Sequence, residues 1–166
     1  MAIKTMDDLF IHELSDTHSA ERQMARQLPR LARAAQNPDL AAAFEAHLEE
    51  TNLQIERLDQ VVELLGLRLK RIKCAAMEGL VEESKEVIES IEKGPLRDAA
   101  LIGGAQKVEH YEIASYGTLC ALAQKLGHAD AVKLLKATLD EEKSTDEKLT
   151  LLAESGGNQM ASDADG

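Results

Sequence analysis

Apolar residues recur every three or four positions along most of the chain, the spacing that places them on one face of an α-helix. Four long segments carry such a stripe, over residues 5–35, 37–66, 96–126 and 129–154. A shorter segment, 75–93, lies between the second and the third of them. Thr5 and Asn37 are good helix caps, and Gly66 and Gly127 stand where two of the segments end. The pattern predicts five helices and no strand.

The order of these helices predicts how they are arranged. Long helices joined by short loops pack antiparallel, whereas a connector as long as a helix lets its two neighbours lie parallel. We therefore expect an all-α fold, a four-helix bundle with one long crossover that carries the short fifth helix. In this prediction residues 1–154 form a single domain, and the polar, acidic residues 155–166 form a disordered tail.

Acidic residues interrupt the apolar stripes near the middle of each long helix, and one histidine accompanies them. These residues are Glu21, His47, Glu50, Glu109, Glu112 and Glu142. The midpoints of the helices in an antiparallel bundle share one level, so these side chains should meet in a single layer. Four ionised and unpaired carboxylates there would cost on the order of ten kcal/mol or more, comparable with the whole stability of a domain.

Bound cations would offset this charge. Carboxylate-rich sites with little imidazole suit Fe(II), Mn(II) or Mg(II) better than zinc or copper, and two divalent ions match the number of carboxylates. We therefore predict a dinuclear metal centre. Each glutamate taken singly also fits a helix-flank residue that reaches water, and His47 also fits a hydrogen-bonded core histidine. Tyr116 fits either the core or a partner of a ligand, and the roles of Gln54, His110 and Asp146 stay open.

The overall charge narrows the range of partners. The chain has 166 residues and a formal net charge of -11 without a long basic run, which disfavours nucleic acid and anionic membranes. No apolar stretch reaches the roughly 18 residues that a membrane span needs. Asp7 and Asp8 follow the start too closely for the apolar core of a signal peptide, and Cys74 and Cys120 lack a CxxC partner. We therefore expect a cytoplasmic protein with reduced thiols.

Several segments of the chain resemble those of the bacterial YciF-type stress proteins, a family of uncharacterised ferritin-like proteins. The likeness spans about residues 3–154 and is most specific around residues 106–118. The segments that carry it are Asp8–His12, Leu14–Thr17, His47–Thr51, Ala75–Leu80, Gln106–Tyr116 and Asp140–Lys143.

The resemblance implies a ferritin-like bundle, homodimeric association and induction by stress. It also implies kinship with rubrerythrin and manganese catalase, which bind two metal ions between their helices. The chain departs from the wider di-iron pattern, in which two helices each carry Glu-x-x-His, because Leu53 follows Glu50 and Thr145 follows Glu142 at that spacing. Carried over residue by residue, the implied ligands are Glu21, His47, Glu50, Glu109, Glu112 and Glu142.

The function that we expect is that of a stress-associated protein with two metal ions in its core, iron rather than manganese. Such a centre would oxidise Fe(II) or consume peroxide, with oxygen or peroxide as the small-molecule substrate. The alternative is a non-catalytic dimeric bundle that acts by binding another stress protein, its acidic layer being hydrated.

Overall fold

Capping side chains mark where the first two long helices begin. In the computed structural model, which describes residues 2–164, the Thr5 hydroxyl accepts a hydrogen bond from the Asp8 N–H at 3.0 Å, and the Asp8 carboxylate accepts one from the Thr5 N–H at 3.2 Å. The Asn37 side chain caps the second helix in the same way, with 2.8 Å to the Asp39 N–H. Gly66, with φ of 59°, follows that helix in the left-handed conformation that glycine adopts without strain.

The five predicted helices are all present, with ends within a few residues of those expected. They are α1 (Met6–Ala34), α2 (Pro38–Leu64), α3 (Ala75–Ser90), α4 (Pro95–Lys125) and α5 (Ala129–Leu152). No strand occurs among residues 2–164. The all-α prediction is therefore confirmed.

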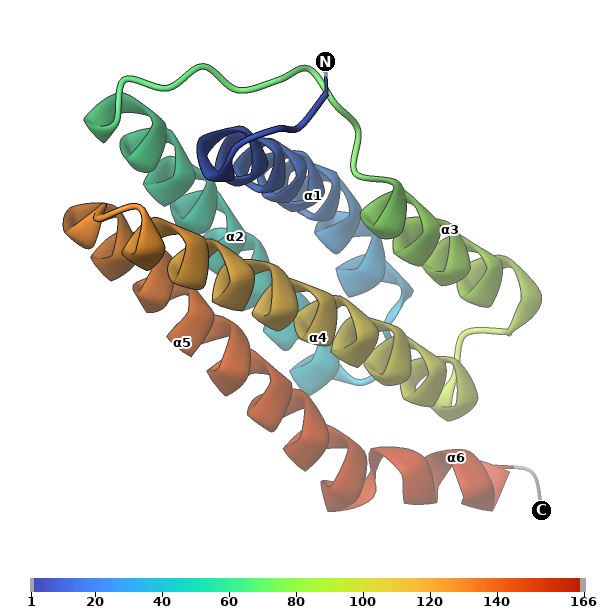
Figure 1. Ribbon diagram of the computed structural model, residues 1–166. Helices are drawn as coiled ribbons and strands as arrows, with labels where there is room; N and C mark the ends of the chain where they lie inside the picture. The colour runs from blue at the N-terminus through green and yellow to red at the C-terminus, as the bar shows by residue number, and fades with distance from the viewer. Residues whose placement is uncertain (1, 165–166) are drawn as a thin grey trace.

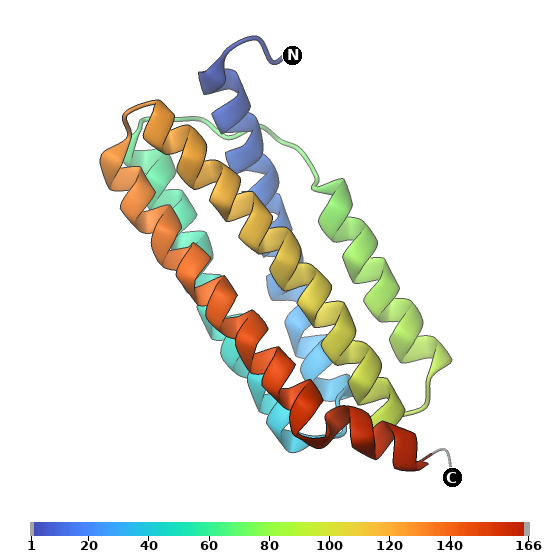
Figure 2. The same cartoon turned by 60° about the horizontal axis from the view of Figure 1, so that its bottom comes forward.

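The four long helices form one bundle (Figure 1). α1 pairs with α2 and α4 pairs with α5, each pair being joined by a tight turn (Figure 2). Between the two pairs, residues 65–74 cross one end of the bundle and lead into α3. α3 lies outside the bundle, against α1 and α4. This is the predicted four-helix bundle with one long crossover that carries a short fifth helix.

Side chains of α1 hold the crossover in place. Ser15 and Ser19, one helical turn apart, accept hydrogen bonds from the backbone N–H groups of Lys70 at 2.9 Å and Cys74 at 3.0 Å. Gln23, one turn further, donates to the Cys74 carbonyl at 3.0 Å. These bonds satisfy backbone groups that have no partner within a helix, and they fix where α3 begins.

The C-terminal prediction was wrong over the part of the tail that the structure describes. We expected disorder from residue 155, but a π-helical turn (Ala153–Gly157) continues α5 and leads into a further helix, α6 (Asn158–Ala164). α6 lies across the end of the bundle against α4, where Ala161 is buried (Figure 2). Packing of α6 against α4 orders this segment, although its polar composition indicated disorder. Residues 165–166, also in the predicted tail, lie outside the described residues.

The apolar core falls into two clusters, one at each end of the bundle. One contains Met24, Leu28, Leu40, Phe44 and Leu149 with their neighbours. The other is built around Phe10, Leu14, Leu58, Leu119 and Leu135. On each long helix, the residues that separate the two clusters along the sequence are buried polar side chains. The bundle thus contains a polar layer between two apolar layers.

Among the residues that the structure describes, no helix has the length and apolar character needed to cross a bilayer.

Candidate metal centre

The polar layer contains five ionisable side chains, drawn from all four long helices. Glu21 of α1, Glu109 of α4 and Glu142 of α5 are 0% exposed, Glu112 of α4 is 1% exposed and His47 of α2 is 5% exposed. Each occupies the inward-facing stripe of its helix, as the sequence pattern predicted. The expectation that acidic side chains from separate helices are buried at one level is therefore met for these residues.

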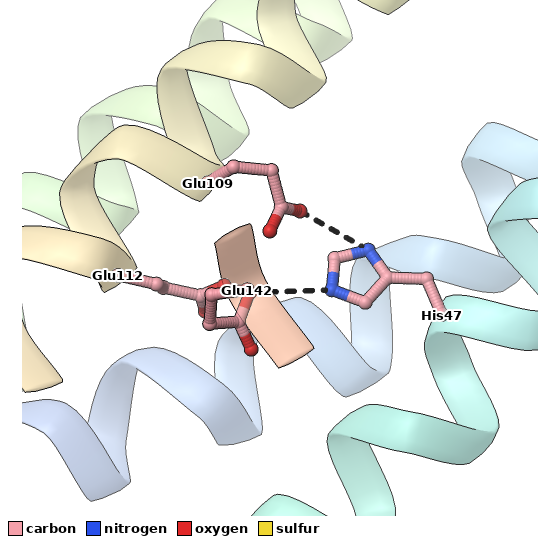
Figure 3. A group of neighbouring side chains, drawn as sticks. All are labelled: His47, Glu109, Glu112 and Glu142. Atoms are coloured by element: carbon pink, nitrogen blue, oxygen red, sulfur yellow. Dashed lines mark ion pairs between the residues drawn. The ribbon is translucent and has the colours of Figure 1, made fainter. Parts of the chain in front are cut away.

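Four of these side chains converge on a single point. His47, Glu109, Glu112 and Glu142 each offer one ligand atom, and these four atoms all lie within 4.8 Å of one another (Figure 3). The imidazole lies between two of the carboxylates, with His47 Nδ1 at 3.4 Å from Glu109 Oε1 and Nε2 at 4.0 Å from Glu142 Oε2. This is a group of donors that could hold a metal ion.

Most donor atoms of this layer have no hydrogen-bond partner. Both oxygens of Glu109, Glu112 and Glu142, together with His47 Nε2 and Glu21 Oε2, are buried and accept or donate no hydrogen bond. Leaving a buried charged group without a partner costs more than the hydrogen bond itself contributes. A divalent cation would satisfy several of these atoms at once, and a carboxylate-rich set with one imidazole suits Fe(II) or Mn(II). The residues present therefore fit a metal ion.

Burial controls the protonation of this layer. Removal from water raises the pKa of Glu109 to about 12, and the nearby Glu142 carboxyl group adds to this effect. Burial and the neighbouring carboxylates also hold the pKa values of Glu21 and Glu112 well above the ordinary value for glutamic acid. Burial lowers the pKa of His47, although Glu142 and Glu50 oppose this, so its imidazole is neutral and able to act as a ligand. Without a cation the layer therefore retains protons.

Glu21 lies beside the group of four and is held by a tyrosine. The Tyr116 hydroxyl donates a hydrogen bond of 2.5 Å to Glu21 Oε1, and both side chains are 0% exposed. Glu21 is close enough to Glu112 for its charge to raise the pKa of that residue. Tyr116, for which the sequence left two roles open, is thus the hydrogen-bond partner of a candidate ligand.

Glu50, like Glu21, is a predicted ligand that lies outside the group of four. It is half-buried, and its Oε2 accepts a hydrogen bond of 3.2 Å from the Thr145 hydroxyl. The reason is helical geometry, because a residue three positions after His47 is rotated about 60° from it around the helix axis. The inward stripe of α2 continues instead through Thr51 and Gln54, which are buried.

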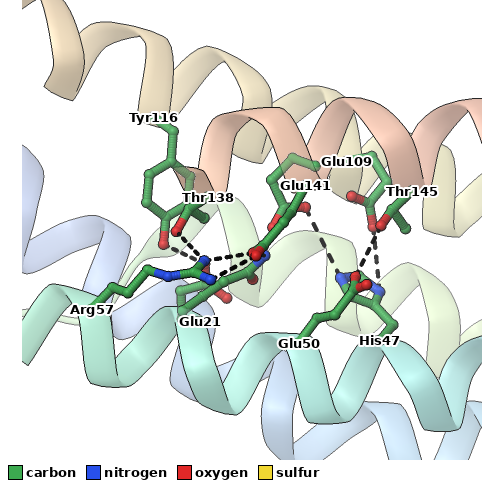
Figure 4. A network of polar contacts seen from close by, with 11 residues as sticks. Glu21, His47, Glu50, Arg57, Glu109, Tyr116, Thr138, Glu141 and Thr145 are labelled. Atoms are coloured by element: carbon green, nitrogen blue, oxygen red, sulfur yellow. Dashed lines mark hydrogen bonds and ion pairs between the residues drawn. The ribbon is translucent and has the colours of Figure 1, made fainter. Parts of the chain in front are cut away.

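An ion pair closes the seam between α2 and α5 next to the layer. The Arg57 guanidinium donates two hydrogen bonds to the Glu141 carboxylate, at 2.6 and 2.7 Å, and a third to the Thr138 hydroxyl at 3.2 Å (Figure 4). Gln54 donates to the same carboxylate at 3.1 Å. Burial alone would raise the pKa of Glu141, but the bonds from Arg57 and Gln54 outweigh it and lower that pKa. This carboxylate therefore stays ionised.

Sequence reasoning missed the Arg57–Glu141 pair and left several neighbours open. No local pattern in the sequence signals this pair, because Arg57 and Glu141 are 84 residues apart and lie on different helices. His110 faces the neighbouring helix α5, where its Nε2 lies 3.2 Å from Asp146 Oδ2. These polar contacts surround the four candidate ligands, and they orient the helices that carry them.

The sequence comparisons agree with this architecture. The family model described as a domain of unknown function, DUF892, matches residues 5–162, which include most of α6. Protein YciF of Escherichia coli (strain K12) is 64% identical over 162 residues, which make up 97% of this chain and 98% of YciF.

Solved structures show the same fold. The crystal structure of the E. coli stress protein YciF has a TM-score of 0.90 and 65% identity, with 93% of this chain and 98% of that chain covered. YcfI from Rhodopseudomonas palustris has a TM-score of 0.86 and 47% identity, with coverage of 89% and 94%. A protein from Xanthomonas campestris pv. campestris, 21% identical with a TM-score of 0.72 and coverage of 91% and 92%, is alike in fold. The chain is a homologue of the stress protein YciF and belongs to the DUF892 family.

Proposed function

We propose that this protein binds two divalent metal ions in its polar layer, iron in preference to manganese, and uses them to oxidise Fe(II) or to consume peroxide during stress. One observation carries the proposal. Three carboxylates and one imidazole, buried between two apolar clusters, bring unsatisfied donor atoms within 4.8 Å of one another. Apolar layers on both sides limit the access of water and so strengthen any electrostatic interaction with a cation.

The four converging residues would hold the first ion, and Glu21 with Glu112 would hold the second. Iron or manganese bound there supplies one-electron redox chemistry towards dioxygen or peroxide. The chain itself provides neutral His47 as a ligand and carboxyl groups that release protons when a cation replaces them. Tyr116 keeps the Glu21 carboxyl group oriented through its hydrogen bond.

The wider biological setting is also a proposal. The relative from E. coli is named a stress protein, and we extend that role to this chain. We expect a cytoplasmic homodimer that binds neither nucleic acid nor membranes, in accord with a net charge of -11. Light scattering should then give a mass near twice 18.1 kDa.

The test is metal binding and turnover with matched variants. Metal-free protein loaded with Fe(II) under anaerobic conditions should bind two ions per chain and then oxidise added Fe(II) when oxygen or peroxide is admitted. Glu109→Gln should bind fewer ions and lose turnover, because an amide is a poorer ligand than a carboxylate. Glu147→Gln, an exposed glutamate of the same helix as Glu142, is the control and should behave as wild type.

Two outcomes would reject parts of this proposal. Sub-stoichiometric binding that Glu109→Gln leaves unchanged would exclude a metal centre in the layer. Full binding without turnover would exclude the oxidoreductase and leave the non-catalytic helical bundle.

A further inference from the structure

A small cavity opens on the seam between α2 and α5, beside the polar layer. Its volume is about 70 Å³, and its polar lining consists of His47, Glu50, Thr145 and Lys148. The remaining walls are apolar side chains of α2, α4 and α5. Sites for organic ligands measure about 300–1,000 Å³, so this cavity is suited only to a much smaller solute.

The lining runs from the surface to the candidate metal ligands. Ala46 and Lys148, which line the cavity, are exposed, Glu50 is half-buried, and His47 is 5% exposed. His47 Nε2 is buried and has no hydrogen-bond partner. The half-buried Glu50 carboxylate thus lies beside the more deeply buried His47 imidazole (Figure 4). The next turns along the same seam are closed by the Arg57–Glu141 pair.

We propose that this cavity is the route by which divalent cations reach the polar layer, and that Glu50 is a transient ligand that passes each cation to His47. This inference rests on the proposed metal-binding function. It assigns Glu50 a role outside the group of four converging ligands, in keeping with its rotation away from the inward stripe of α2.

Charge and ligand chemistry both favour a cation as the solute. A hydrated cation must lose water before it enters an apolar passage, and that loss is costly unless protein oxygens replace the water. Glu50 offers carboxylate oxygens at the half-exposed level, and the Thr145 hydroxyl, 3.2 Å from Glu50 Oε2, offers another oxygen. The ammonium group of Lys148 is on a long side chain that can move into water as the cation approaches.

The experiment measures how fast metal-free protein takes up and releases Co(II), which reports binding through its visible absorption. The variants are Glu50→Gln, which removes the carboxylate, and Ala46→Leu, which narrows the cavity. Each has a matched control of the same chemistry at an exposed position of α2 that does not line the cavity: Glu49→Gln for the first and Ala42→Leu for the second.

The route predicts a kinetic effect without a comparable equilibrium effect. Glu50→Gln and Ala46→Leu should slow both uptake and release of Co(II) by about tenfold, while the dissociation constant stays within about threefold of wild type. The two control variants should match wild type in all three quantities. Circular dichroism and the stoichiometry at saturation show that each variant is folded and able to bind.

Three results would overturn the route. A larger dissociation constant in Glu50→Gln, with an unchanged rate of Co(II) uptake, would show that Glu50 is a resident ligand. If Ala46→Leu takes up and releases Co(II) at the wild-type rates, the route lies elsewhere, and the proposal of a metal centre is unaffected. Absence of Co(II) binding by wild-type protein would remove the centre and the route together, so the two proposals fail in distinguishable ways.

Discussion

At the scale of single residues, burial decides which acidic side chains matter. The stripe of the helical pattern located Glu21, Glu109, Glu112 and Glu142 correctly, since each replaces an apolar residue on an inward face. The Glu50 carboxylate, by contrast, is half-buried and is turned towards Thr145 of α5. Fine rotation about a helix axis depends on how neighbouring helices pack, which one sequence alone does not specify.

The hydrogen bond between Tyr116 and Glu21 yields a prediction at this scale. Tyr116→Phe removes the hydroxyl but keeps the ring, and it leaves Glu21 Oε1 buried without a partner. We expect the free energy of unfolding of the metal-free protein to fall by about 1–3 kcal/mol. Urea denaturation measures this loss.

A double-mutant cycle with Glu21→Leu is the control for that prediction. Once Glu21 is gone, Tyr116→Phe should cost much less, because the acceptor that needed the hydroxyl is absent. Equal losses in the two backgrounds would show that the hydroxyl contributes to stability independently of Glu21.

At the scale of helices, sequence reasoning was accurate for ends and weak for contacts between helices. Caps such as Thr5 and Asn37 are local signals, so the starts of α1 and α2 were predictable. The sequence did not predict α6, because its polar composition gives no apolar stripe to mark the face on which Ala161 is buried. Its stability depends on packing against α4, which no local pattern reports.

Asp98 provides a prediction for such a contact between helices. Its two carboxylate oxygens, on α4, accept hydrogen bonds of 2.8 Å each from the backbone N–H groups of Gln36 and Asn37, in the turn between α1 and α2. The side chain is 5% exposed. Asp98→Ala should lower the free energy of unfolding by about 2–4 kcal/mol, since it leaves two N–H groups without their acceptor. Chemical denaturation monitored by circular dichroism measures the change.

The comparison for Asp98 is Asp130, an exposed aspartate whose contact is an ion pair with Lys133 within the first turn of α5. Asp130→Ala should cost less than about 0.5 kcal/mol, because exposed ion pairs contribute little. Similar small losses in both variants would contradict the role given to Asp98 in joining α4 to the turn.

At the scale of the whole molecule, the proposed cation site would couple folding to cation binding through the polar layer. Two apolar clusters could have formed one continuous core, yet the bundle places buried carboxyl groups between them. Without a cation those groups must retain protons to remain buried, whereas a cation replaces the protons. The stability of the metal-free protein should therefore depend on pH in a characteristic direction.

The direction follows from the pKa of Glu109, which folding raises from 4.5 to about 12. Between these values the folded chain keeps a proton that the unfolded chain has released, so the stabilisation is complete below about pH 4.5 and declines as pH rises towards 12. Each such proton should lower the free energy of unfolding by about 1.4 kcal/mol per pH unit. The groups with lowered pKa values act in the opposite sense, Asp8 and Glu141 only near and below the unfolded-state values of about 4, and His47 below its unfolded-state value of 6.5. The single His47 imidazole offsets only part of the effect of Glu21, Glu109 and Glu112, whose pKa values are all raised.

We therefore expect the urea midpoint of metal-free protein to fall steadily from pH 5 to pH 8. Manganese-loaded protein, whose carboxyl groups have already lost their protons, should show a flatter dependence, and the metal-free Glu109→Gln variant should also be flatter than wild type. A midpoint that rises with pH in metal-free wild-type protein would show that the layer is ionised without a cation.

If the buried acidic layer is a cation site, crystals grown with Mn(II) should hold ordered metal inside the bundle, which anomalous diffraction detects. We expect one anomalous peak enclosed by His47, Glu109, Glu112 and Glu142, and a second beside Glu21 and Glu112. Crystals saturated with Mn(II) whose anomalous peaks all lie on the molecular surface, with none inside the bundle, would contradict this expectation.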